Sequence, residues 1–113
     1  MKKQYRVKKN DEFQYIFKHG DSFANRQLVI YYLEKKDQRH FRVGISVGKK
    51  LGNAVMRNQI KRYIREAFRH FEPNIKPNYD VIVIARKPTT TMSGEEIRNS
   101  LKHLLIRTKL LVQ

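Results

Sequence analysis

Residues 49–71 combine a helical apolar repeat with an almost purely basic remainder. Gly52 can break the secondary structure before the helix. Asn53 can cap the first helical turn, because its side-chain oxygen accepts from free backbone N–H groups. Apolar residues then recur at spacings of three and four. They are Ile60, Tyr63, Ile64, Ala67, Phe68 and Phe71. The stretch predicts an amphipathic helix that packs one side against a core.

The polar residues of this helix form two groups on a wheel at about 100° per residue. Those opposite the apolar stripe are Asn58, Arg62, Arg65 and Arg69, and those on its seam are Arg57 and Lys61. Lys49 and Lys50 precede the helix, and Glu66 is its single acid. The outer face of a helix is usually only solvated, but such faces mix charges. Because this face is nearly all positive and Arg suits phosphate oxygens, it predicts contact with a nucleic acid.

The composition agrees with a polyanionic partner. The 113 residues hold 25 Lys and Arg against 10 Asp and Glu, a formal net charge of +15. Such a surplus attracts RNA, DNA or an anionic membrane. A membrane partner is disfavoured, because no apolar run approaches about 20 residues and no apolar segment follows the basic start. The chain has no Cys, which fits a reducing, cytoplasmic location.

The periodicities predict a single domain over residues 1–113 with an α+β fold. Residues 1–9 are expected to be flexible, or ordered only against a partner. A helix then begins at an Asn10 cap and stops at Gly20. Strands follow at residues 27–34 and 41–47, the basic helix comes next, a strand buried on both faces covers 79–85, and a last helix begins at Ser93. The order α-β-β-α-β-α predicts one layer of mixed sheet packed with helices.

Two features leave alternatives open. Phe13 and Phe17 share one helix face, where core packing is favoured over base stacking. Gly44 and Ser46 share one strand face, and their small size leaves room for either a packed helix or a ligand backbone.

The sequence predicts no catalytic or metal-binding residues in the chain itself. Its acids fall at helix starts or at spacings that do not suit a metal ion. The four His residues stand alone, and the glycines at 44 and 48 lack the spacing of a phosphate-binding loop. Any chemistry is therefore expected from a partner.

Several segments resemble the protein subunit of bacterial ribonuclease P, in the right order and over nearly the whole chain. The most specific is residues 49–68, KKLGNAVMRNQIKRYIREAF, which resembles the Arg-Asn-Arg helix of that family and its lead-in. Residues 13–20, 24–26 and 85–88 also match family segments. One position departs from the pattern, because Gln59 stands where the family has its second Arg. We expect this to weaken one contact and to leave the function intact.

The resemblance implies a function and a set of contacts. The family's catalytic RNA removes the 5′ leader of precursor tRNA with Mg²⁺ that the RNA mainly holds. Implied contacts to that RNA are Arg57, Asn58, Lys61, Arg62, Arg65, Arg69, Lys49 and Lys50. Implied contacts to the leader are Phe13, Phe17, Tyr31, Arg86 and Lys87. The resemblance also implies a fold like that of a ribosomal protein domain with a left-handed βαβ crossover, and a protein that is a monomer on its own.

Two rival functions share the charge and the small α/β build. A non-enzymatic RNA-binding protein of the ribosomal kind would be indifferent to a 5′ extension on tRNA. An architectural DNA-binding protein would prefer duplex DNA and would have no use for a single-strand cleft.

Overall fold

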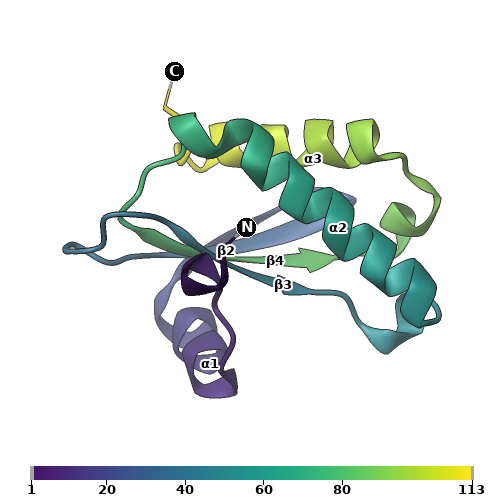
Figure 1. Cartoon of the computed structure of the whole chain (residues 1–113), viewed down its shortest axis with the longest axis horizontal. Helices are drawn as coiled ribbons and strands as arrows, with labels where there is room; N and C mark the ends of the chain where they lie inside the picture. The colour runs from purple at the N-terminus through teal and green to yellow at the C-terminus, as the bar shows by residue number, and fades with distance from the viewer. Residues whose placement is uncertain (1, 113) are drawn as a thin grey trace.

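The computed structural model describes residues 2–112 and has one four-stranded sheet with helices on both faces (Figure 1). The strands are β1 (Asp21–Ala24), β2 (Leu28–Glu34), β3 (Arg42–Ser46) and β4 (Tyr79–Ala85), in the spatial order β1-β2-β4-β3. β4 pairs antiparallel with β2 and parallel with β3. The predicted strand buried on both faces is therefore confirmed as an inner strand of a mixed sheet.

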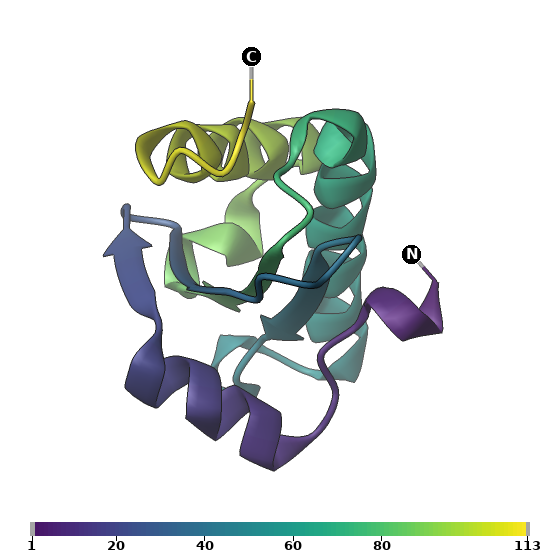
Figure 2. The ribbon, with the colours of Figure 1, turned by 90° about the vertical axis from the view of Figure 1, so that its left-hand side faces the viewer.

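Three α-helices cover the two faces of the sheet. They are α1 (Asn10–His19), α2 (Ala54–Phe71) and α3 (Gly94–Arg107). α2 and α3 lie on one face and α1 lies on the other (Figure 2). Short 3₁₀ turns lie before α1 at Lys3–Tyr5 (η1) and between later elements at Lys49–Leu51 (η2), Glu72–Asn74 (η3) and Lys87–Thr91 (η4).

The main core lies between the sheet and the pair α2 and α3. Leu28, Ile30, Ile64, Phe68 and Leu101 are all fully buried in it. A smaller apolar cluster on the other face joins α1 to the sheet through Val7, Ile16 and Ile82. The two faces of the sheet are thus packed very unequally.

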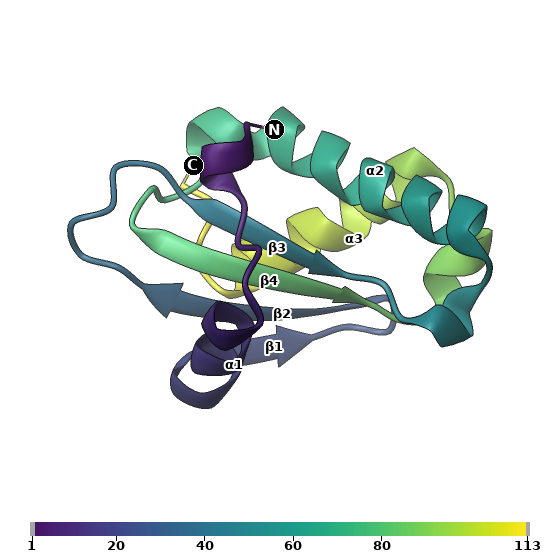
Figure 3. The ribbon, with the colours of Figure 1, turned by 60° about the horizontal axis from the view of Figure 1, so that its bottom comes forward.

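The connection from β3 through α2 to β4 is left-handed. In Figure 1 both strand arrows point to the right and α2 lies above the sheet. Figure 3 brings the bottom of the molecule forward and shows β4 below β3. Viewed from the α2 side with the strands pointing up, β4 therefore lies to the left of β3. This is the crossover that the family resemblance implies, against the usual right-handed rule.

The structure contains one strand that the predicted order lacks. β1 pairs antiparallel with β2 across a turn in which the Asn25 side chain accepts from the backbone N–H groups of Gln27 and Leu28. The strand has four residues, and three of them are exposed. A short polar edge strand gives no apolar alternation, so periodicity alone could not reveal it.

Two predicted helix ends also differ. α1 begins at Asn10 itself and Lys9 holds the cap position, without a side-chain bond. Gly20 ends the helix, but its φ is −84°, outside the left-handed region. The position requires glycine because a Cβ there would lie 2.7 Å from the Tyr32 carbonyl oxygen and 2.8 Å from that of Ile16.

Residues 2–8 pack against the body of the protein, and the expected flexibility of residues 1–9 stays a prediction, with residue 1 outside the described residues. Val7 is buried, and its N–H donates to the Val43 carbonyl at 3.0 Å. Arg6 forms a parallel bridge with Val43. The segment therefore extends the sheet beside β3 before the chain enters α1 (Figure 3).

None of the described helices is long and apolar enough to cross a bilayer.

Candidate nucleic-acid interface

The cations of the candidate interface are positioned by the burial of one side of α2. The predicted cap is confirmed, because the Asn53 side chain accepts from the Met56 N–H at 2.9 Å. Ile60, Ile64 and Phe68 are fully or almost fully buried against the sheet and α3. The polar side of the helix is thereby fixed toward solvent and toward the edge of β3.

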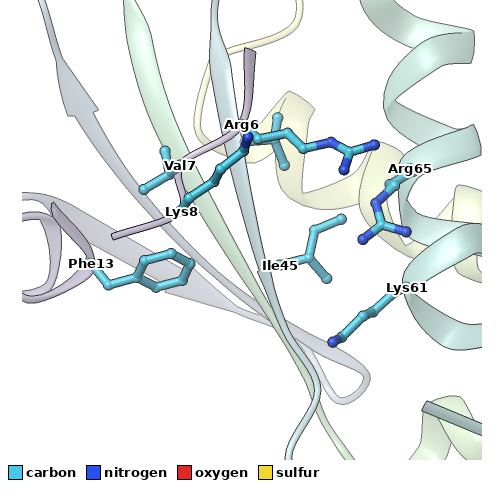
Figure 4. A pocket seen from close by; sticks show the side chains of 8 residues that line it. Arg6, Val7, Lys8, Phe13, Ile45, Lys61 and Arg65 are labelled. Carbon is cyan, nitrogen blue, oxygen red and sulfur yellow. The ribbon is translucent and has the colours of Figure 1, made fainter. Parts of the chain in front are cut away.

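A hollow of about 320 Å³ opens between α2, β3 and the N-terminal segment (Figure 4). Its lining residues are Arg6, Val7, Lys8, Phe13, Val43, Ile45, Lys61 and Arg65. Two cations come from the N-terminal segment, two come from α2, and no acid among residues 2–112 lines the hollow. The apolar lining comes from β3, Val7 and α1. A phosphate with an apolar neighbour, such as a nucleotide unit, matches this lining.

Arg65 is one of the two α2 cations that line this hollow. Its side chain is half-buried, although the wheel places it opposite the apolar stripe. Burial, and then the positive charge of Arg6, lower the pKa of the Arg65 guanidinium. An arginine remains protonated nonetheless. Two guanidinium groups held near each other repel, so a bound anion between them would be stabilised.

The remaining predicted cations of α2 have different surroundings. Arg57 donates to the Gly52 carbonyl at 3.2 Å, at the start of the helix. Arg62 is exposed, lies 5.5 Å from the Tyr63 ring centroid and is 3.8 Å from Glu66. Such an exposed ion pair contributes little to stability. Arg69 is exposed and lines a separate hollow with Lys2, Tyr5, His40 and Glu72.

Four further predicted cations share one end of the sheet. Lys49 and Lys50 follow β3, and Arg86 and Lys87 follow β4. Since these strands are parallel, their carboxyl ends lie at the same edge. All four side chains are exposed. Arg86 also donates to the Asn25 carbonyl at 2.9 Å, which holds it beside the β1–β2 turn.

The three predicted leader-binding aromatics lie together on the α1 face of the sheet. The Phe17 ring meets Tyr31 edge-on at a centroid distance of 4.9 Å and Phe13 at 6.2 Å. All three rings are half-buried. They pack against the small apolar cluster and also keep part of their surface open. Core packing and an accessible aromatic surface therefore coexist here.

Sequence reasoning missed the two N-terminal cations of the hollow, Arg6 and Lys8. Their signal is the alternation Arg6-Val7-Lys8. Val7 is buried, and in an extended segment its two neighbours point to the opposite side. Three residues are too few for a strand prediction without a known partner strand.

The acids near α1 are held in an ion-pair network. Arg42 donates to the fully buried Asp80 at 2.7 and 3.0 Å and to Glu12 at 2.8 Å. The bond to Asp80, and to a smaller extent the bond to Glu12, raises the pKa of Arg42. The bond from Arg42 in turn lowers the pKa of Glu12. Among residues 2–112, no group of three or more acidic, His or Cys side chains is placed to hold a metal ion.

The family model described as Ribonuclease P matches residues 1–109 of this chain. The chain belongs to the ribonuclease P protein family. The ribonuclease P protein component of Oceanobacillus iheyensis is 66% identical over 111 residues, which are 98% of this chain and 92% of that protein. The component from Exiguobacterium sibiricum is 55% identical and covers 96% and 93% of the two chains.

Solved structures of the ribonuclease P protein family share the fold. The Staphylococcus aureus RNase P protein superposes with a TM-score of 0.89 at 53% identity, over 95% of this chain and 97% of that one. The Thermotoga maritima RNase P protein superposes with a TM-score of 0.82 at 33% identity, over 90% and 96%. The predicted family, its fold and its place in ribonuclease P are thereby confirmed, and the rival functions are not favoured.

Gln59, the departure from the family's Arg-Asn-Arg pattern, bonds within its own helix. Its side-chain nitrogen donates to the Tyr63 hydroxyl at 2.8 Å. The residue is exposed, so the amide stabilises a tyrosine on the helix surface and presents no charge to a partner.

Proposed function

We propose that this chain binds the catalytic RNA of ribonuclease P through α2 and the 5′ leader of precursor tRNA through the α1 face of its sheet. The observation that supports the first contact most strongly is the hollow lined by the four cations Arg6, Lys8, Lys61 and Arg65. Arg57, Asn58, Arg62, Arg69, Lys49 and Lys50 extend the basic surface. Their role is to neutralise phosphates where two RNA chains approach each other.

The proposed leader path begins at the aromatic group of Phe13, Phe17 and Tyr31. The next row of the same sheet face holds Val29, Ile84 and Ser46, which are half-buried. Beyond that row lie Arg86 and Lys87. A single strand can stack bases on the aromatic rings and place phosphates at the two cations without sequence preference.

The chemistry of leader removal is assigned to the RNA. On the family resemblance, the Mg²⁺ belongs mainly to the RNA. The protein contributes binding and orientation, and it acts as a monomer in the cytoplasm. Contacts to the leader raise the affinity for precursor tRNA above the affinity for mature tRNA. Because the mature product lacks these contacts, it is released more readily.

The test is leader cleavage of a precursor tRNA at low magnesium concentration. Three reactions are compared, with a bacterial ribonuclease P RNA alone, this protein alone, and both together. The proposal expects cleavage only with both. Cleavage by the protein alone would overturn the assignment of catalysis to the RNA.

A second measurement addresses the leader. The dissociation constants of the assembled complex for precursor and mature tRNA are compared, and the precursor is expected to bind more tightly. Equal affinities, together with tight binding of the RNA subunit, would favour the ribosomal kind of RNA-binding protein.

A further inference from the structure

The N-terminal segment is fixed at two points on either side of Arg6. Tyr5 stacks on His40 with a ring-centroid distance of 3.5 Å and an interplanar angle of 16°. Val7 is 4% exposed and bonds to the Val43 carbonyl. Because both neighbours are anchored, the position of the Arg6 backbone is determined by the body of the protein.

The Tyr5 anchor connects to the core through a row of rings. His40 also stacks on Phe41 at 4.5 Å, and Phe41 lies 6.1 Å from Phe68 of α2. The His40 ring nitrogens lie 2.6 Å from the Phe41 carbonyl oxygen and 3.4 Å from a Glu72 carboxylate oxygen. These contacts fix the plane of the imidazole on which Tyr5 stacks.

Arg6 is thereby held where its charge meets that of Arg65. Figure 4 shows Arg6 reaching from the edge of β3 toward Arg65 and Lys61 on α2. Arg6 is one of the two causes of the lowered pKa of Arg65. Cations fixed close to one another raise the local positive potential, and that potential favours an anion bound between them.

We propose that Arg6 is a phosphate-binding residue of the RNA interface and that the Tyr5–His40 stack is its positioning device. The ligand is a phosphodiester of the RNA that α2 contacts, held between Arg6 on one side and Arg65 and Lys61 on the other. Neither Tyr5 nor His40 needs to touch that phosphate. The inference rests on the proposed function, since it assumes that α2 faces RNA.

The experiment measures the affinity of the full chain for a bacterial ribonuclease P RNA across a KCl series. Arg6→Gln removes the charge and Tyr5→Ala removes the stack. The loss of one phosphate contact is expected to lower the salt slope by about 0.7 to 0.9 and the affinity by about tenfold. Both variants should show this loss, and Tyr5→Phe should restore the parent behaviour.

The double variant separates positioning from a general loss of stability. If Tyr5 acts through Arg6, then Tyr5→Ala adds no further loss in the Arg6→Gln background, because coupled residues are non-additive. Additive losses, or a parent-like slope in Arg6→Gln, would overturn the proposal. Circular dichroism of each variant establishes that it is folded.

Two controls make the outcome specific. Lys36→Gln removes an exposed cation from the turn between β2 and β3 and should leave the slope at the parent value. Arg62→Gln should lower the slope, because Arg62 belongs to the proposed α2 surface. If Arg62→Gln lowers it and Arg6→Gln does not, only this inference fails. If neither lowers it, the proposed function of α2 fails with it.

Discussion

At the scale of single residues, Gly44 determines how closely α1 approaches the sheet. A Cβ at this position would lie 2.6 Å from the tip of the Phe13 ring. At Gly44, the predicted small-residue face of β3 is therefore filled by a packed helix, and the space belongs to Phe13, one of the proposed leader-binding aromatics. A methyl group here would displace Phe13.

Gly44→Ala should therefore reduce both stability and leader discrimination. Overpacking of this kind costs about 1–3 kcal/mol, which urea unfolding would measure. The displaced ring should also narrow the difference in affinity between precursor and mature tRNA. Gly48→Ala is the matched control, because no atom lies within 4 Å of a Cβ there. A Gly44→Ala protein with unchanged discrimination would separate Phe13 from the leader.

The Glu12–Arg42 pair predicts a pH dependence of stability. The pKa of Glu12 is lowered in the folded protein, mainly by its bond to Arg42. A carboxylate with a lowered folded pKa stabilises the protein above its unfolded value, near 4.5, and loses that contribution as the pH falls through the folded value.

Glu12→Gln should accordingly be less stable than the parent at pH 7 and equally stable in strong acid. The difference at pH 7 should be within about 1 kcal/mol, because the pair is partly exposed. Urea unfolding of both proteins at pH 7, 5 and 3 measures it. A difference that grows toward acid pH would show that Glu12 does not act through its charge.

At the scale of elements, sequence patterns predicted correctly those helices and strands that carry a long apolar pattern or a clear cap. β4 was predicted with its observed bounds, because seven apolar-rich residues lie on an inner strand. The predicted start of the last helix at Ser93 is also confirmed, because Ser93 caps α3 and forms a capping box with Glu96. α2 was predicted with its cap and buried side. Each of these elements carries a local signal that tertiary contacts only reinforce.

The elements that were missed depend on partners distant in sequence. β1 is a strand because β2 lies beside it, and Arg6 and Val7 pair with Val43 because β3 offers an open edge. The candidate site likewise combines residues that local sequence patterns predict with a contact that depends on the tertiary fold. The cations of α2 are predicted by a helical wheel. The closeness of Arg6 to Arg65 could not be predicted, because it requires the β3 edge to bring residues 6 and 65 together.

The cap of α2 can be tested separately from its charge. Asn53→Ala removes the bond to the Met56 N–H and should cost about 1 kcal/mol of stability. Asn53→Asp keeps an acceptor, and its negative charge suits the helix start, so stability should be retained. The same charge lies near Lys49 and Lys50, so RNA affinity should fall.

Thermal unfolding and RNA titration of the two Asn53 variants measure these effects. The expected pattern is a destabilised Asn53→Ala protein and a stable Asn53→Asp protein that binds RNA less tightly than the parent. An Asn53→Asp protein with parent affinity would place the RNA away from the start of α2.

At the scale of the whole molecule, the net charge of +15 gives folding and binding opposite responses to salt. Positive charges repel one another in the compact state, and added salt screens that repulsion. RNA binding releases counterions, so added salt weakens it. The hollow at the β3 edge, with its four lining cations, is one place where both effects act on the same side chains.

Raising KCl from 50 to 200 mM should therefore raise the melting temperature of the free protein while it lowers the affinity for a ribonuclease P RNA. With six or more phosphate contacts, the affinity should fall by about a thousandfold or more. Thermal unfolding without RNA and RNA titration in the same buffers measure the two responses. Arg6→Gln should show a smaller rise in melting temperature than the parent, because one repelling charge is already absent. A melting temperature that falls with salt would mean that attractive ion pairs, such as Arg42 with Asp80 and Glu12, outweigh the repulsion among the cations.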